Sequence, residues 1–146
     1  MKQKIKNALI SVSDKESLKS LLIILRKYKI NIISSGGTYR SIKKLGFKCE
    51  EISEYTGFDE MLDGRVKTLH PKIHSGILFD RKKNSHKKQM KSKNFQAIDL
   101  VVVNFYPFKE ILKKTSNNKK IIENIDIGGP SMVRAAAKNS NDVVII

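Results

Sequence analysis

The sequence has little of what marks secreted and membrane proteins. It contains one cysteine, Cys49, among 146 residues. A single cysteine excludes an intrachain disulfide and is typical of a protein in the reducing cytosol. The longest unbroken aliphatic run covers only residues 21–25, whereas a membrane-spanning helix needs about 20 apolar residues. The apolar stretch near the N-terminus lacks the length and the cleavage site of a secretory signal. We therefore expect a soluble, cytoplasmic protein with no membrane partner.

Acidic residues are scarce as well. Asp and Glu number 14 against 29 Lys and Arg, a formal net charge of +15. A chain this basic attracts phosphate groups in general, on nucleic acids or on small metabolites. The cations gather in residues 81–93 and 113–120, without the interleaved aromatic residues or Arg-Gly pattern of a nucleic-acid platform. A solvated, lysine-rich surface explains these segments better, so we expect no nucleic-acid partner.

The length suits one domain covering residues 1–146. A chain of this size buries about two-thirds of its extended surface on folding, which is enough for a hydrophobic core. Hydrophobic residues make up 40% of the sequence and charged residues 29%. This composition excludes a disordered chain and a disulfide scaffold.

Short apolar segments alternate along the chain with segments of helical periodicity. Strands are expected at residues 8–12, 31–34, 49–52, 98–105 and 143–146. Helices are expected at residues 16–28, 38–45 and 130–138, with a polar helical stretch and a loop over 108–124, and a surface helix or a loop over 82–93. Thr38 is expected to cap the second helix, and Gly46 to end it. Crossovers of this length favour parallel pairing. The sequence therefore predicts a doubly wound α/β fold, a mainly parallel five-stranded sheet with helices on both faces.

In such sheets, ligands bind beyond the carboxyl ends of the strands. That rule selects residues 13–15, 35–38 and 104–106. Gly36 and Gly37 would let backbone N–H groups approach an anion closely, at the positive end of the following helix. A plain strand-to-helix turn accounts for the two glycines equally well.

Lys15 is harder to explain by structure alone. Ser13 and Glu16 fit a capping box at the start of the first helix. A cation at a helix N-terminus, however, opposes the helix dipole. A bound phosphate would remove this conflict.

Other polar residues have ordinary structural explanations. His70 and His74 are four residues apart with no adjacent carboxylate or third ligand, so no metal site is expected. Asp126 precedes a glycine pair. Lys138 falls near the end of the last helix, where a cation ordinarily stabilises the helix dipole.

Five segments together carry a family resemblance: residues 11–15 (SVSDK), 34–38 (SSGGT), 64–78 (GRVKTLHPKIHSGIL), 104–108 (NFYPF) and 125–139 (IDIGGPSMVRAAAKN). In this order they resemble the N-terminal IMP cyclohydrolase domain of the bifunctional purine biosynthesis proteins, which join AICAR formyltransferase to IMP cyclohydrolase. The resemblance covers essentially the whole chain and implies a methylglyoxal-synthase-like fold. Ser75 stands where the family usually has Gly or Ala. The formyltransferase domain is expected to be absent from this chain.

The resemblance implies closure of the purine ring, the last step of de novo purine biosynthesis. The carboxamide nitrogen of the formylated AICAR ribonucleotide (FAICAR) attacks its own formyl carbon, and water leaves to give IMP. The step requires no cofactor; 10-formyltetrahydrofolate would serve only the absent formyltransferase domain. The family also implies a homodimer.

The resemblance further implies which residues act. Lys138 would be the main proton donor and acceptor, with Asp126 orienting or relaying; Lys67 would hold the formyl or carboxamide oxygen, and Tyr106 would assist proton transfer. The nucleotide would be bound by Ser13, Asp14, Lys15, Ser35, Gly36, Gly37, Thr38, Arg65, Thr68, Val103, Asn104 and Ile127. The phosphate would meet Lys15 and residues 35–38. We therefore expect Lys67 and Lys138 to converge on one nucleotide pocket at the rim of the sheet.

Three alternatives stay open. The same fold is found in methylglyoxal synthase, which acts on a three-carbon phosphate. It also serves as the nucleotide-sensing regulatory domain of carbamoyl phosphate synthetase, which binds without turnover. The third alternative is a nucleic-acid-binding module driven by the net charge of +15.

Overall fold

Five parallel strands form one sheet in the computed structural model, which describes residues 4–146. The strand order is β3-β2-β1-β4-β5, and every neighbouring pair is parallel. The strands are β1 (Asn7–Val12), β2 (Asn31–Ser34), β3 (Glu50–Glu51), β4 (Leu100–Asn104) and β5 (Val144–Ile145). Each lies at its expected place in the chain, so the predicted parallel sheet is confirmed.

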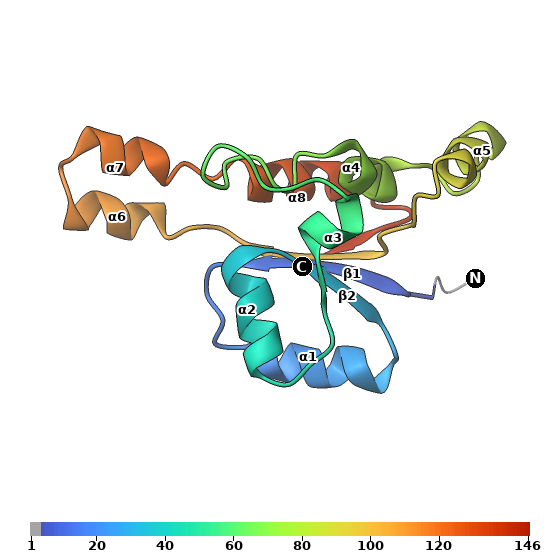
Figure 1. Cartoon of the computed structure of the whole chain (residues 1–146), viewed down its shortest axis with the longest axis horizontal. Helices are drawn as coiled ribbons and strands as arrows, with labels where there is room; N and C mark the ends of the chain where they lie inside the picture. The colour runs from blue at the N-terminus through green and yellow to red at the C-terminus, as the bar shows by residue number, and fades with distance from the viewer. Residues whose placement is uncertain (1–3) are drawn as a thin grey trace.

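Helices cover both faces of this sheet, as a doubly wound fold requires (Figure 1). One face carries α1 (Leu18–Lys27) and α2 (Gly36–Lys44), and the other carries α3 (Ile52–Thr56), α4 (Pro71–Leu78) and α8 (Gly128–Lys138). The remaining helices are α5 (Asn84–Ser92), α6 (Phe108–Lys114) and α7 (Asn118–Glu123). α3 and α4 were not expected from the sequence. For residues 82–93 the sequence left a helix or a loop open, and the structure shows a helix, α5.

Two predicted helix starts are wrong. α1 begins at Leu18 with Ser17 at its N-cap, so Ser13 and Glu16 form no capping box; instead the backbone N–H of Glu16 donates to the Asp14 carboxylate at 2.9 Å. α2 begins at Gly36, which places Thr38 inside the helix and not at its cap. Gly46 does follow the helix end with φ of +78°, as expected.

The core lies in two layers because the strands are apolar on both faces. Leu9, Ile33 and Val101 pack toward α3, α4 and α8, while Ile10 and Val102 pack toward α1 and α2. Strands buried on both sides are held firmly in register. The sheet is therefore a rigid support for the loops at its ends.

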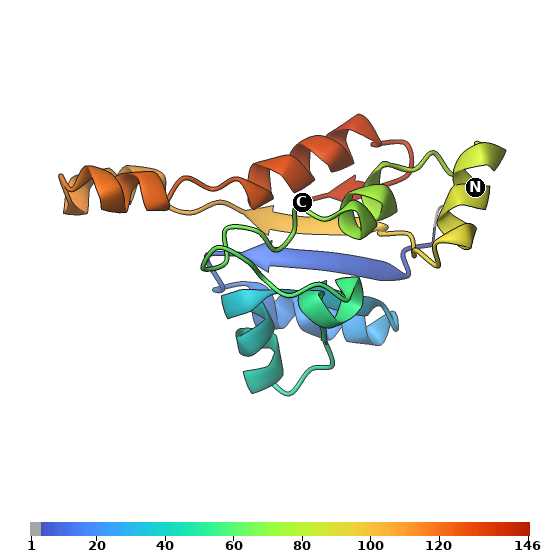
Figure 2. The same ribbon diagram turned by 45° about the horizontal axis from the view of Figure 1, so that its top comes forward.

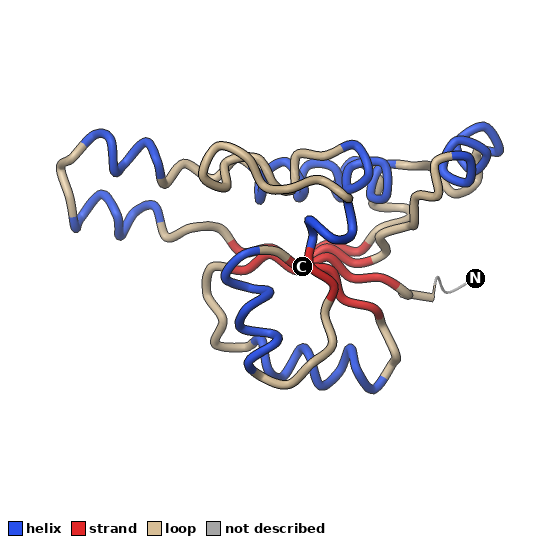
Figure 3. The backbone as a smooth tube through the Cα atoms, in the orientation of Figure 1, coloured by secondary structure: helices blue, strands red, loops and turns tan. Residues whose placement is uncertain are grey.

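The carboxyl ends of β1, β2 and β4 meet at one edge of the sheet. In Figure 2 the arrowheads of β1 and β4 point toward α6 and α7, and Figure 3 shows the loops gathered at that edge. The polar segments that follow these strands therefore lie together, as the sequence predicted.

α6 and α7 form a helical hairpin that projects beyond the sheet layers in both views (Figures 1 and 2). We call residues 105–127, which contain both helices, the arm. It leaves the end of β4 and returns at the start of α8. None of the helices within residues 4–146 is long and apolar enough to cross a membrane.

Candidate active site

A cavity of about 580 Å³ opens at the carboxyl edge of the sheet. It is lined by parts of residues 11–15, 35–38, 63–68, 104–106 and 122–132. Its volume lies in the range of small-molecule sites, about 300–1,000 Å³. Five stretches from across the chain thus meet where the fold predicts a ligand.

Most of the expected site residues line this cavity. They are Ser13, Lys15, Ser35, Gly36, Gly37, Thr38, Arg65, Lys67, Thr68, Asn104, Tyr106, Asp126 and Ile127. Asp14, Val103 and Lys138 do not line it. Asp14 is exposed and its carboxylate accepts from the Glu16 backbone, and Val103 packs against the core.

The N-terminus of α2 forms one wall of the cavity. Ser35 occupies the N-cap without a side-chain hydrogen bond to the helix, and Gly36 has φ of +54°, a conformation that favours glycine. The first backbone N–H groups of a helix have no partner within the helix. Here they face the cavity with the positive end of the helix dipole, an arrangement suited to a phosphate.

Two ammonium groups stand beside this helix end. A Cβ at Gly37 would lie 4.0 Å from Lys15 Nζ, and one at Gly36 would lie 3.3 Å from Lys67 Nζ. Lys15 Nζ donates to the Ser13 carbonyl at 2.9 Å. Positive charge near a positive helix end is unfavourable without an anion. The cavity is therefore electrostatically prepared for a phosphate or carboxylate group.

Lys67 is held in place by packing and by an ion pair. Its Nζ lies 2.9 Å from the Glu60 carboxylate. A Cβ at Gly64, whose φ is +85°, would lie 2.6 Å from Lys67 Cε. Gly36 and Gly64 thus leave the space that the lysine side chain occupies.

Arg65, which lines the cavity, forms an ion pair with Glu123 on α7. Hydrogen bonding from Arg65 lowers the pKa of the Glu123 carboxyl, and the same bond raises the pKa of Arg65. Both side chains are more than half exposed, so solvent screens their attraction. This pair joins the loop before α4 to the arm.

Asp126 also lines the cavity, just before the N-terminus of α8. Its carboxylate accepts a 2.9 Å hydrogen bond from the Gly129 backbone N–H, and a Cβ at Gly129 would lie 2.5 Å from Asp126 Oδ2. A Cβ at Gly128 would meet the Thr68 hydroxyl at the same distance. The glycine pair therefore lets Asp126 and Thr68 approach the helix end closely.

Asn104 and Thr38 organise the cavity floor and have few hydrogen-bonding positions left for a ligand. The Asn104 side-chain oxygen accepts from the backbone N–H of Ser13 at 2.5 Å and of Asp14 at 3.1 Å, and its amide donates to the Asp14 carbonyl at 2.9 Å. The buried Thr38 hydroxyl donates to the Val12 carbonyl and accepts from the Val12 N–H. Both side chains position the loop after β1.

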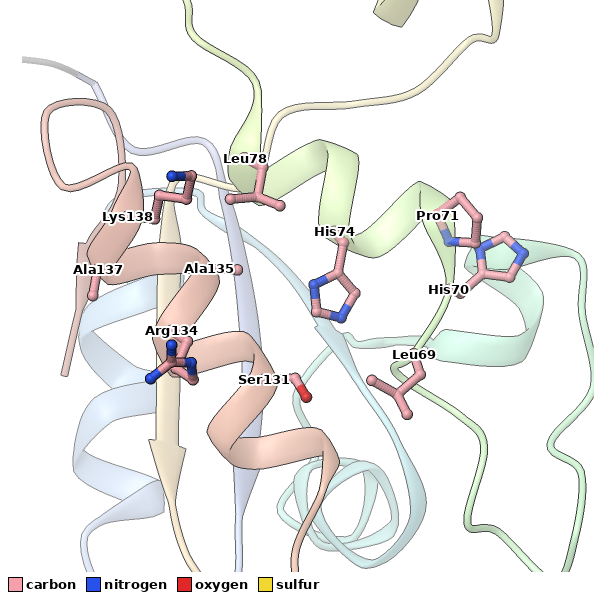
Figure 4. A pocket seen from close by; sticks show the side chains of 10 residues that line it. All are labelled: Leu69, His70, Pro71, His74, Leu78, Ser131, Arg134, Ala135, Ala137 and Lys138. Carbon is pink, nitrogen blue, oxygen red and sulfur yellow. The ribbon is translucent and has the colours of Figure 1, made fainter.

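The expected convergence of Lys67 and Lys138 is wrong within one chain. Lys138 lines a separate open groove between α4 and α8, near Leu78 and at the far end of α8 from Ser131 (Figure 4). Ten residues of helix separate it from Gly128, a rise of about 15 Å. Its side chain is exposed, as expected of a cation that stabilises a helix C-terminus.

Comparison with known proteins identifies the family. The model of the MGS-like domain matches residues 18–131. The chain belongs to the MGS-like domain family. Among solved structures, a crystal structure of ForH superposes on it with a TM-score of 0.82, at 32% identity, covering 97% of this chain and 74% of that one. The methylglyoxal-synthase-like fold expected from the resemblance is therefore confirmed.

Three curated relatives of this MGS-like domain carry the same name. The bifunctional purine biosynthesis protein PurH of Acetivibrio thermocellus is 53% identical over 143 residues, and those of Leptospira biflexa and Clostridium acetobutylicum are 50% and 51% identical. Each match covers 97% of this chain and 28% of the relative. The chain thus spans between a quarter and a third of the length of these relatives and corresponds to their N-terminal domain.

The MGS-like domain also pairs two cavity residues with carboxylates that the sequence analysis did not select. Glu60 and Glu123 neutralise Lys67 and Arg65, although Glu123 is 58 residues from its partner. One sequence gives no signal for a pairing between such distant charges. Gly64 lies in one of the segments that carry the resemblance, but its contact with the Lys67 side chain depends on the path of the loop.

Proposed function

We propose that this domain is an IMP cyclohydrolase, which closes the ring of FAICAR with loss of water. The observation that carries the proposal is that two lysines beside the N-terminus of α2 line the same cavity as Asp126. The cavity has groups that can bind an anion and a group that can transfer a proton. This combination suits a phosphorylated substrate that undergoes an intramolecular reaction. The kinship with PurH proteins supports a purine nucleotide as that substrate.

The phosphate of the nucleotide would bind at the N-terminus of α2. Backbone N–H groups of residues 36–38 and the Lys15 ammonium would neutralise its charge. This leaves the base of the nucleotide pointing toward α8. Positioning the carboxamide and the formyl group against each other removes much of the entropic barrier to cyclisation.

The ring closure moves two protons to the formyl oxygen, one from the carboxamide nitrogen and one from the formylated nitrogen, so that the oxygen leaves as water. Asp126 would accept the proton of the carboxamide nitrogen as it attacks the formyl carbon, because an amide nitrogen is a poor nucleophile. Lys67 would stabilise the oxyanion that forms on the formyl oxygen. Tyr106, half exposed at the cavity wall, would assist protonation of that oxygen, which leaves as water.

Turnover of FAICAR tests the proposal directly. The purified chain is mixed with FAICAR and IMP formation is followed by absorbance, with Lys44→Ala, an exposed lysine at the opposite end of α2, as the control variant. We expect IMP to form faster than in buffer, and the control to match the unmodified chain. Binding of IMP without turnover would instead support a nucleotide-sensing domain. Methylglyoxal formed from dihydroxyacetone phosphate would support methylglyoxal synthase.

A further inference from the structure

Consecutive residues in the loop before α4 have left-handed backbones. Leu62, Asp63 and Gly64 have φ of +55°, +55° and +85°. Glycine adopts this conformation freely, but a bulky residue such as leucine is strained in it, and such strain persists only where the surrounding structure requires it. Leu62 is 65% exposed, so burial of its side chain does not account for the strain. The strained turn therefore has its use in the residues that it brings together.

The turn closes a short hairpin. The backbone N–H of Met61 donates to the Val66 carbonyl at 3.0 Å, and the N–H of Val66 donates to the Met61 carbonyl at 3.2 Å. The two residues thus form an antiparallel bridge. In an antiparallel pair, the residues next to such a bridge face each other with their side chains close together. On the side away from the turn these residues are Glu60 and Lys67, so the hairpin brings an acidic side chain opposite a basic one.

The two side chains form an ion pair beside Gly64. Lys67 Nζ lies 2.9 Å from the Glu60 carboxylate. A Cβ at Gly64 would lie 2.9 Å from Lys67 Nζ and 3.6 Å from Glu60 Oε2, so a side chain at this position would intrude on the pair. The turn, the bridge and the glycine all favour the same contact.

Lys67 needs a counter-charge because its surroundings are positive. Its Nζ lies beside the N-terminus of α2, at 3.3 Å from where a Cβ at Gly36 would lie, and Lys15 Nζ stands beside Gly37. An ammonium group on a flexible aliphatic chain is repelled by such a helix end and moves toward solvent when nothing holds it. The Glu60 carboxylate opposes that repulsion.

Glu60 acts on Lys67 from outside the cavity. Lys67 lines the cavity, whereas Glu60 does not. An ammonium group has more N–H donors than one contact with a carboxylate uses, so Lys67 can still donate to a ligand. Exposed ion pairs contribute little to the stability of a fold, and the Glu60 side chain is 58% exposed. The placement of Lys67 is therefore what the strained turn provides.

We propose that Glu60 is a positioning residue that fixes the Lys67 ammonium beside the N-terminus of α2, ready to meet the substrate. The effect on turnover rests on the proposed cyclohydrolase function, whereas the position of the ammonium group is a property of the chain alone. Removal of the Glu60 charge changes the surroundings of Lys67 first, and turnover through Lys67.

The NMR signal of the Lys67 ammonium group tests the placement without substrate. In proton–nitrogen spectra of the isotopically labelled chain, this signal is identified by its loss in Lys67→Arg. Glu60→Gln keeps the size of the side chain and removes its charge, so the Lys67 signal should shift toward those of exposed lysines. Asp59→Asn, at an exposed neighbour, is the matched control and should leave the signal in place. A Lys67 signal that Glu60→Gln does not shift would overturn the proposal.

Turnover tests what the placement does. Glu60→Ala should lower kcat for FAICAR about tenfold. KM should stay within a factor of about three, because Lys15 and the N-terminus of α2 still bind the phosphate. In a Lys67→Ala background, Glu60→Ala should have no further effect on kcat. If the two losses multiply instead, or if Glu60→Ala raises KM and leaves kcat unchanged, Glu60 does not act through Lys67 and the proposal is wrong.

Failure of the proposed function can be told apart from failure of this inference. If the unmodified chain forms no IMP from FAICAR, the cyclohydrolase proposal is wrong, and the Lys67 signal alone decides the role of Glu60. If IMP forms and Asp59→Ala lowers kcat as much as Glu60→Ala does, the effect is one of net charge, and Glu60 is not a positioning residue. Circular dichroism of each variant checks that the fold is kept.

Discussion

The two ends of α8 face different surroundings, although eleven residues of one helix join them. At the N-terminal end, Asp126 and Thr68 lie tightly against a glycine pair inside a cavity shared by five segments. At the C-terminal end, Arg134 and Lys138 are exposed along an open groove. A motif that is continuous in sequence thus divides between two surfaces. Lys138 belongs to the same sequence motif as Asp126 but does not line the cavity.

The largest expected effect is at the N-terminal end. Asp126→Asn keeps an oxygen that can accept the Gly129 N–H but removes the base, so kcat for FAICAR should fall by about 10²–10⁴-fold. KM should change little, because the phosphate-binding end of the cavity is untouched. Steady-state kinetics check both values. A variant with kcat within a factor of about three would exclude Asp126 as the base.

Two lysine variants compare the ends directly. Lys67→Ala removes the proposed oxyanion donor, and kcat should fall by about 10²–10³-fold. Lys138→Ala removes a cation outside the cavity. The fall in kcat should therefore be at least about tenfold smaller than for Lys67→Ala. Equal losses from the two variants would mean that Lys138 of another copy enters the cavity. A mixture of the two variants would then recover activity.

The affinity for a nucleotide should depend on the residues around the N-terminus of α2, among them Lys15, and not on either end of α8. Lys15→Ala removes one charge-assisted hydrogen bond to the phosphate, so Kd for IMP should rise by about tenfold or more. Calorimetric titration measures this value, with Arg134→Ala on α8 as the control. An unchanged Kd for Lys15→Ala would place the phosphate elsewhere.

The smallest expected effect concerns His74, on α4 beside the C-terminal half of α8. Burial lowers the pKa of its imidazole below the usual 6.5. The unfolded chain then binds a proton more readily, so the stabilisation is complete above about pH 6.5 and is lost as the pH falls through the lowered pKa. His74→Gln should reduce the drop in Tm between pH 7 and pH 5 by on the order of 1–2 °C. His86→Gln, on α5, should leave the drop unchanged in the same thermal scans.

The sequence predicted the sheet because its strands and helices have strong, distinct periodicities. Residues 98–105, which contain β4, are an example: they are apolar on both faces, as a central parallel strand must be. The short helices were harder to predict: α3 has five residues, too few for a periodic pattern, and α4 begins at Pro71, a residue type that interrupts helix interiors. Proline also suits the first helical turn, where its missing N–H has no intrahelical partner to lose.

The site was predictable in part for a similar reason. The rule that ligands bind at the carboxyl edge selected residues 13–15 and 35–38 without knowledge of any contact. Distances along a helix determine whether Lys138 can join them, and a resemblance between motifs carries no such information. The pairing of Arg65 with Glu123 depends on the path of the arm, which a single sequence does not specify.

The side chain of Asn104 ties two loops that are 90 residues apart in the chain. Its three hydrogen bonds form only when β1 and β4 are already paired, so the cavity floor is completed after the centre of the sheet has assembled. Contacts between such distant residues are slow to form because a long loop must close first. A chain caught early in refolding would consequently contain much of its helix but lack the completed cavity, which would be the last part of the fold to return.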